Sequence, residues 1–335
     1  MQVTFLGTSA GAPTKQRNVS GVALRNGSTW DLFDCGEATQ HQLLHTPLSL
    51  ARLRRVFISH LHGDHCFGLF GLLGSRSMSG SNTALTIIGP PGLRAMVELV
   101  LETSDTHLTY PIEFVEVTET GGRVVETAEL TVDALPLTHR VMSFAWLMQE
   151  GERAGRLNPD AARAAGVPDG PLFGKLARGE TVQLDDGRTV KPDDIVGDAR
   201  PGRRVIIAGD NSAPRELLER TGPVHLLVHE ATFTEPVLET LGDDWGHSTA
   251  ARVAIAAEQA GVNNLVLTHF SPRYLSVRPR TDGGSGSSVM TIGDVENEAR
   301  EHFSRSLHLA NDFDMVELGV DGTSVEITAR DAVLS

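Results

Sequence analysis

Three histidines and an aspartate fall within six positions of the stretch HLHGDH, at His60, His62, Asp64 and His65. The stretch follows RRVFIS at 54–59, an apolar run typical of a buried strand. Neutral imidazole and carboxylate groups are the side chains that hold Zn²⁺ and similar divalent ions. A tight turn would place His60 and His62 on one side, while Asp64 and His65 would begin the next helix. The spacing predicts a metal site with enough ligands for two neighbouring ions.

Three further polar residues each come just after an apolar strand. His139 follows LTVDALPLT, Asp210 follows RRVIIAG, and His269 follows NNLVLT. In layered α/β proteins, residues at strand ends gather at one edge of the sheets. We therefore expect these three side chains to join the HLHGDH cluster.

A carboxylate and a histidine form a second candidate pair. Glu230 lies in VHEATF directly after a strand, and His247 lies in WGHSTA just before a helix. A helix N-terminus disfavours imidazolium, whereas a nearby carboxylate favours it. Pairing with Glu230 would therefore make His247 a proton donor near neutral pH. The alternative is that His247 only packs at the start of the helix.

The elements that must position these residues alternate along the chain. A helix is predicted over 248–260, with Ser248 as its N-cap and Gly261 as its stop, and weaker helices over 91–103 and 291–305. The apolar runs predict strands at 2–6, 30–34, 54–59, 84–88, 129–135, 203–208, 224–228 and 263–268. Strands mixed with helices, without a repeat, predict a layered α/β structure in which helices cover packed sheets.

Composition narrows the class of protein. The chain has 335 residues, 40% of them hydrophobic, which fits one large globular domain over 1–335. Two cysteines are too few for a disulfide scaffold, and no signal or membrane-spanning pattern is present, so we expect a cytoplasmic protein without a membrane partner. The net charge of −14 argues mildly against a nucleic-acid partner. Bound divalent cations would offset this charge where a phosphate would lie.

Two stretches interrupt the pattern of strands and helices. Residues 151–202 are rich in Gly, Pro, Asp and Arg and are too long for an ordinary connection. They form either a solvated insertion or a protruding arm that binds a partner. Residues 278–289, RPRTDGGSGSSV, have the composition of a flexible loop.

Taken together, these motifs resemble the metallo-β-lactamase superfamily and, within it, the short form of the ribonuclease Z family, which are tRNA 3′-processing endonucleases. HLHGDH with the later His139, Asp210 and His269 carries the superfamily resemblance. The narrower resemblance rests on FLGTSAGAPTKQRNVS, DCGEATQ, PPGL, PLTHRVMSFAW, DGPLFGKL, AGDN, HEATF, GHST and LTHFSPRY, which together extend over most of the chain.

The resemblance implies an αββα sandwich with two Zn²⁺ ions per subunit at one edge, although another divalent ion is possible. Asp210 would bridge the two ions. One ion would take His60, His62 and His139, and the other Asp64, His65 and His269.

The resemblance also implies a flexible, tRNA-binding arm at residues 151–202, in which Gly170 and Pro171 match the family's GP element. The half 151–178, which includes Lys175, has five Arg or Lys residues against three acids, so any phosphate contact should lie there. By the same resemblance, Lys15, Arg17 and Asn18 would lie beside the nucleotides that flank the cut. The family is usually a homodimer.

The predicted activity is removal of the 3′ trailer from precursor tRNA, leaving a 3′ hydroxyl on the tRNA and a 5′ phosphate on the trailer. Asp64 would orient and deprotonate the attacking water, and His247, held by Glu230, would protonate the departing oxygen. One alternative is a broader phosphodiesterase, or another hydrolase of this fold, that does not act on tRNA. Another is a non-enzymatic RNA-binding or metal-storage protein, which would not need Glu230 and His247.

Overall fold

The computed structural model describes residues 1–152, 155–198, 200–242, 245–276 and 289–329. The chain divides into two compact units, one of them made of Met1–Glu126, Val132–Met148 and Arg204–Ser335 and the other of Thr127–Thr131 and Gln149–Arg203. Every helix in the described residues is too short or too polar to span a bilayer. Residues 278–288 of the predicted flexible loop lie outside the described residues.

The first sheet of the larger unit has the strand order β17-β16-β1-β2-β3-β4-β5-β6. Strands β3, β4, β5 and β6 are parallel to one another. Along the rest of the sheet, from β17 through β16, β1 and β2 to β3, each strand pairs with the next in antiparallel fashion. The strands are β1 Gln2–Gly7, β2 Gly21–Asn26, β3 Thr29–Phe33, β4 Leu53–Phe57, β5 Leu85–Gly89, β6 Ile112–Glu116, β16 Met315–Leu318 and β17 Val325–Thr328.

The second sheet has the order β15-β14-β13-β12-β9-β8-β7. Strands β12 to β15 are parallel, so the carboxyl ends of these four strands meet at one edge. The strands are β7 Gly122–Glu126, β8 Leu130–Leu137, β9 Ser143–Glu150, β12 Arg204–Ala208, β13 Leu226–Glu230, β14 Asn264–Thr268 and β15 Ser306–Leu309.

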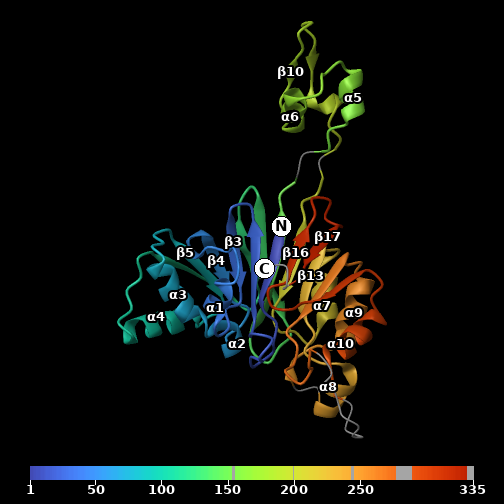
Figure 1. Cartoon of the computed structure of the whole chain (residues 1–335). Helices are drawn as coiled ribbons and strands as arrows, with labels where there is room; N and C mark the ends of the chain where they lie inside the picture. The colour runs from blue at the N-terminus through green and yellow to red at the C-terminus, as the bar shows by residue number, and fades with distance from the viewer. Residues whose placement is uncertain (153–154, 199, 243–244, 277–288, 330–335) are drawn as a thin grey trace. The chain divides into compact units, whose positions relative to one another are not determined.

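Helices cover the outer face of each sheet, while the inner faces pack together (Figure 1). On the inner faces, the Phe57 ring of β4 lies 5.1 Å from the Trp146 ring of β9. The first helical layer contains α1 Thr39–Leu43, α2 Gly63–Cys66, α3 Leu69–Met78 and α4 Leu93–Thr103, with the 3₁₀ turn η1 Leu50–Arg52. The second contains α7 Pro214–Thr221, α8 Glu235–Leu241, α9 Ala250–Gln259 and α10 Ile292–Arg300. This arrangement confirms the predicted αββα fold.

The predicted strands and helices are found in the structure with two local corrections: the helix predicted over 291–305 ends at Arg300, and the predicted N-cap of the helix over 248–260 is wrong. All eight predicted strands are present within two residues of their predicted bounds. The N-cap of α9 is Thr249, whose side chain accepts a hydrogen bond from the Arg252 amide, and not Ser248 as predicted. The Ser248 hydroxyl instead donates to the carbonyl oxygen of Asn211, so Ser248 ties two loops together.

The smaller unit has a hydrophobic core of its own. Its elements are α5 Pro159–Ala164, α6 Pro171–Ala177, the short strands β10 Val182–Gln183 and β11 Thr189–Val190, and the 3₁₀ turn η2 Pro192–Asp194. They bury Ala162, Val167, Leu176, Val182, Leu184, Val190 and Ile195. The unit covers nearly the same residues as the predicted arm, 151–202, and its binding to tRNA stays a prediction.

The two ends of the arm are joined at its base. The Glu150 amide donates to the carbonyl oxygen of Arg203 at 3.0 Å, and the Arg203 guanidinium donates to both carboxylate oxygens of Glu150. Both side chains are buried, so the ion pair is shielded from water. The chain therefore leaves and re-enters this base at adjacent points.

Candidate metal centre and active site

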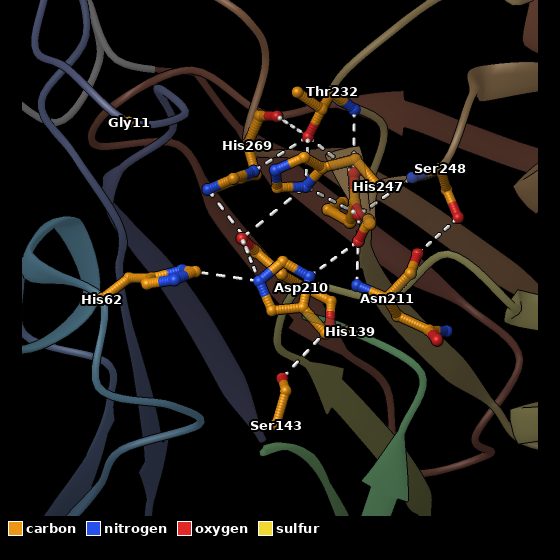
Figure 2. A network of polar contacts seen from close by, with 12 residues as sticks. Gly11, His62, His139, Ser143, Asp210, Asn211, Thr232, His247, Ser248 and His269 are labelled. Atoms are coloured by element: carbon orange, nitrogen blue, oxygen red, sulfur yellow. Dashed lines mark hydrogen bonds and ion pairs between the residues drawn. The ribbon is translucent and has the colours of Figure 1, made fainter. Parts of the chain in front are cut away.

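The predicted ligands come from the ends of several strands, and the structure brings all seven together. His60 and His62 follow β4, and Asp64 and His65 lie in α2. His139 follows β8, Asp210 follows β12 and His269 follows β14. Figure 2 shows His62, His139 and His269 converging on Asp210 from different elements.

A first group of ligand atoms comes from His60, His62, His139 and Asp210, and these atoms lie within 4.8 Å of one another. Nε2 of His60 is 3.0 Å from Nδ1 of His62, which is 3.4 Å from Nε2 of His139. Oδ2 of Asp210 lies 3.6 Å from Nε2 of His60 and 3.9 Å from Nε2 of His139. Such a set of imidazoles and one carboxylate fits a divalent ion of the zinc type.

A second group consists of Asp64, His65 and His269. Nε2 of His65 is 3.2 Å from Nε2 of His269, and Oδ2 of Asp64 is within 3.5 Å of both. Oδ1 of Asp210 lies 3.4 Å from each of the two imidazole nitrogens. Asp210 therefore presents one oxygen to each group, as a bridging carboxylate requires.

The tautomer of four histidines is set by the group that contacts their Nδ1 atom. Nδ1 of His65 faces Asp34, Nδ1 of His139 faces the Gly246 carbonyl oxygen, and Nδ1 of His269 faces the Thr232 hydroxyl. Nδ1 of His60 faces the Ser59 hydroxyl. In the neutral imidazole, an acceptor at Nδ1 holds the ring proton and leaves the lone pair of Nε2 pointing into the cluster. Burial disfavours the charged form of His65, but the carboxylates of Asp210, Asp34 and Asp64 outweigh burial and raise its pKa to about 10, so an ion that binds there must displace the Nε2 proton.

The buried oxygen Oδ1 of Asp210 supports the same conclusion. It has no hydrogen-bond partner within the part of the chain that the structure describes. An unpaired buried carboxylate oxygen is costly, and a cation between it and the facing nitrogens would satisfy it. The residues present therefore fit a pair of divalent cations.

Asp34 is a functional residue for which the sequence analysis gave no role. Its Oδ2 accepts hydrogen bonds from Nδ1 of His65 and from the Ser59 hydroxyl, and its Oδ1 accepts from the Ser59 amide. The sequence pattern could have indicated this role, because Asp34 is a polar residue at the end of an apolar strand, like Asp210 and His269. Asp34 orients two imidazoles of the cluster, His65 directly and His60 through Ser59.

Glu230 and His247 form a pair beside the cluster. Nδ1 of His247 lies 3.2 Å from Oε1 of Glu230 and 3.6 Å from Oδ2 of Asp210. The buried Glu230 carboxylate also accepts hydrogen bonds from the amides of Asn211, Thr232 and Ser248 and from the Thr232 hydroxyl. Glu230 is therefore fixed by four donors and holds His247 against the cluster.

The charges around the site shift the pKa values in opposite directions. Burial disfavours the imidazolium form of His247, but the nearby carboxylates of Glu230 and Asp210 outweigh burial and raise its pKa to about 9. Burial and the neighbouring histidines lower the pKa of His60 well below its usual value. His60 is thus neutral, as a ligand must be, whereas His247 carries a proton that it can donate.

The predicted substrate loop around Lys15 is tied to the cluster. The Gly11 amide donates to Oδ2 of Asp64 at 2.8 Å. Lys15 is exposed, and the Asn18 side-chain amide donates to the carbonyl oxygen of Glu37. Arg17 is buried, and its guanidinium donates to Thr8, Ala310 and Asn311. In this structure Arg17 holds the loop from inside, and its contact with RNA stays a prediction.

The three predicted arm residues lie together within the smaller unit. Gly170 has a φ of 140° and precedes Pro171, the first residue of α6. Lys175 lies in the last turn of the same helix. Gly170 supplies a backbone conformation that other residues rarely adopt, and Pro171 then begins the helix.

Comparisons with known proteins assign the fold and the family. The family model described as "Anti-Pycsar protein Apyc1" matches residues 1–109. The metallo-β-lactamase fold protein YhfI from Bacillus subtilis is 18% identical, with a TM-score of 0.61, and covers 94% of this chain and 98% of its own. At that identity the likeness shows the fold alone.

More similar proteins cover nearly the whole chain. "Ribonuclease Z" from Pseudomonas putida (strain W619) is 46% identical over 98% of this chain and 99% of its own length. "Ribonuclease Z" from Brevibacillus brevis is 49% identical over 82% of this chain and 86% of its own. The crystal structure of human tRNase Z, short form, is 26% identical with a TM-score of 0.65, and covers 96% of this chain and 100% of its own. This chain, with its metallo-β-lactamase fold, therefore belongs to the ribonuclease Z family.

Proposed function

We propose that the protein is an endoribonuclease that cleaves the 3′ trailer from precursor tRNA. The observation that carries the proposal is the pair of Glu230 and His247, with 3.2 Å between carboxylate and imidazole, beside a cluster of metal-ligand side chains. A protein that only stored metal would not need a buried carboxylate to hold a protonated histidine at the edge of the cluster. The ribonuclease Z relatives at 46–49% identity support an RNA substrate.

We propose two zinc ions as the metal content. His60, His62 and His139 would hold one ion, and Asp64, His65 and His269 would hold the other, with Asp210 between them. When bound, the ions would supply Lewis acidity to the scissile phosphate and would lower the pKa of the attacking water from ~16 toward ~7. The positive charge of the ions would also offset the protein's net charge of −14, at the place where an anionic substrate must bind.

Asp64 and His247 divide the proton transfers between them. Oδ2 of Asp64 faces the imidazoles of His65 and His269, the other members of the second group, and is held by the Gly11 amide. In this position Asp64 would orient the attacking water and accept its proton. Attack on phosphorus in line expels the 3′ oxygen of the tRNA. His247 donates its proton to that oxygen, and Glu230 stabilises the imidazolium before transfer. The products are a tRNA with a 3′ hydroxyl and a trailer with a 5′ phosphate.

The substrate would be held at two places, one beside the cut and one on the arm. Lys15, Arg17 and Asn18 form the loop whose neighbour Gly11 contacts Asp64, and we propose that Lys15 is its phosphate-binding member because it is exposed. In the arm, Gly170, Pro171 and Lys175 would contact the body of the tRNA. By the family resemblance, we further propose a homodimer in the cytoplasm, in which the arm of one copy presents tRNA to the site of the other.

A cleavage assay on a precursor tRNA with a 3′ trailer tests the proposal. We expect a single cut after the mature sequence, loss of cleavage when the protein is treated with a metal chelator, and recovery on adding Zn²⁺. Asp64→Ala and His65→Ala should each abolish cleavage. Exposed His302 provides the control, because His302→Ala should leave cleavage unchanged.

The same protein should be assayed on bis(p-nitrophenyl) phosphate, a thioester and a lactone. Turnover of these compounds without cleavage of precursor tRNA would replace the proposal with a broader hydrolase of this fold. Cleavage of precursor tRNA by the Asp64→Ala variant would remove the cluster from the mechanism. Analytical ultracentrifugation tests the proposed dimer separately.

A further inference from the structure

An arginine and a tryptophan at the edge of the cluster have no part in the mechanism above. Arg140 directly follows His139, and Trp245 lies two residues before His247. Both side chains are exposed, and 44% of Trp245 is accessible although the neighbouring cluster is mostly buried. The Arg140 guanidinium carbon lies 6.0 Å from the centre of the indole ring. A cation and an aromatic face therefore lie side by side next to two site histidines.

The backbone fixes this arrangement to the site. Nδ1 of His139 lies 2.7 Å from the Gly246 carbonyl oxygen, so the segment with Arg140 is tied to the segment with Trp245. Gly246 has a φ of 73°, and a Cβ there would lie 2.9 Å from Nδ1 of His139 and 3.1 Å from Cγ of Arg140. Trp245 Nε1 also donates to the carbonyl oxygen of Leu241 at 3.3 Å. The backbone segments that carry Trp245 and Arg140 are thus tied together by the same contact that orients His139.

Most arginines in the described part of the chain form an ion pair or a hydrogen bond, but Arg140 does not. Within the residues that the structure describes, it forms neither an ion pair nor a hydrogen bond, although the chain carries a net charge of −14. An uncommitted guanidinium is suited to bind a phosphate, and an exposed indole is suited to stack on a nucleobase. Together they match the two parts of a nucleotide.

We propose that Trp245 and Arg140 form a nucleotide subsite on the leaving-group side of the cut, an inference that rests on the proposed function. The indole stacks on the base of the nucleotide whose 3′ oxygen receives the proton of His247, because Trp245 lies only two residues before His247 in the chain. Arg140 binds the phosphate on the 5′ side of that nucleotide. Through this stacking contact, the base contributes to which substrates the protein selects.

The test for Trp245 combines protein variants with substrates that lack one base. Wild type, Trp245→Ala and Trp245→Phe are compared on a precursor tRNA, on one abasic at the nucleotide 5′ to the cut, and on one abasic at the nucleotide 3′ to the cut. On the intact substrate we expect Trp245→Ala to lower kcat/KM by about 5- to 100-fold, mainly through KM, with rescue by Trp245→Phe. The loss should vanish on the 5′-abasic substrate and persist on the 3′-abasic one.

An equal loss on all three substrates would overturn the subsite, because the effect would then not pass through that base. Loss that persists on the 5′-abasic substrate and vanishes on the 3′-abasic one would overturn it as well, because the indole would then act on the other base. Leu99→Ala is the matched control, since Leu99 is also an exposed apolar residue, at 63%, but lies on α4. If wild type does not cleave the precursor at all, the proposed function fails first and the subsite with it.

The role of Arg140 is tested separately, by the salt dependence of kcat/KM. Replacing a phosphate-binding cation lowers the slope of log(kcat/KM) against log[salt] by about 1. We expect that decrease for Arg140→Gln and an unchanged slope for Arg94→Gln, whose exposed side chain pairs with Glu98. An unchanged slope for Arg140→Gln would remove Arg140 from the subsite.

Discussion

Oδ2 of Asp34 lies 2.7 Å from Nδ1 of His65, so a residue outside the ligand set holds one of its imidazoles. The same carboxylate oxygen accepts a hydrogen bond from Ser59, whose hydroxyl contacts His60. His60 and His65 belong to different ligand groups. One carboxylate therefore orients imidazoles at both of the proposed ions.

Asp34→Asn should weaken metal binding while leaving the fold intact. The carboxylate accepts from three donors, and an amide has only one oxygen to offer them. We expect metal affinity to fall by about 10- to 100-fold, measured by competition with a chelator. Asp105→Asn is the control, because its side chain is 95% exposed. Unchanged affinity in Asp34→Asn would show that the ligand imidazoles are oriented without it.

His247→Ala should lower turnover without removing metal. Loss of a general acid typically costs about 10²–10⁴ in rate, and the seven predicted ligands remain in the variant. The measurements are kcat on precursor tRNA and metal content by elemental analysis. If metal content falls together with kcat, His247 is a ligand, which its 3.6 Å distance from Asp210 also permits.

Gly68→Ala should displace the helix that carries Asp64 and His65. A Cβ at Gly68 would lie 1.9 Å from the carbonyl oxygen of Gly36, and backbone atoms cannot move aside cheaply. We expect a loss of about 1–3 kcal/mol in the free energy of unfolding, measured with urea. Gly74→Ala is the matched control in α3, where a Cβ meets nothing within 4 Å. That change should stabilise the protein by about 0.5–1 kcal/mol.

Removal of the arm should separate tRNA recognition from catalysis. Because Glu150 and Arg203 are paired at the base of the arm, deletion of residues 152–201 leaves Gly151 and Gly202 as a two-residue turn. Gly-Gly is suited to such a hairpin. We expect cleavage of precursor tRNA to be lost and turnover of bis(p-nitrophenyl) phosphate to be retained. Equal loss on both substrates would assign the arm a structural role.

The two cysteines should be protected from thiol reagents in the folded protein. Cys35 and Cys66 are both fully buried, and burial raises the pKa of the Cys35 thiol. Since the thiolate is the reacting species, a raised pKa slows reaction further. We expect no fast reaction with Ellman's reagent at pH 8 and two reactive thiols after denaturation. A fast-reacting thiol in the native protein would contradict the buried positions.

The sequence predicted the residues of the cluster better than the residues that orient them. HLHGDH and the three residues at strand ends could be found because ligand chemistry is confined to few residue types and strand ends meet at one edge. Family membership and the αββα fold are confirmed by the relatives and the two sheets. Asp34 lies at a strand end like the clustered residues and could have been found, whereas the role of Ser59 depends on its contact with Asp34 across the fold. The N-cap of α9 was misplaced by one residue because Ser248 has a long-range partner, Asn211, that local sequence does not show.

The site is assembled from both sheets, and this has a consequence for synthesis on the ribosome. His60, His62, Asp64 and His65 emerge early, whereas Asp210, Glu230, His247 and His269 belong to the later half of the chain. A nascent polypeptide therefore holds only part of the seven-residue set until His269 has been added. Nuclease activity can appear only after the last of these residues has left the exit tunnel, so an incomplete product cannot cut RNA.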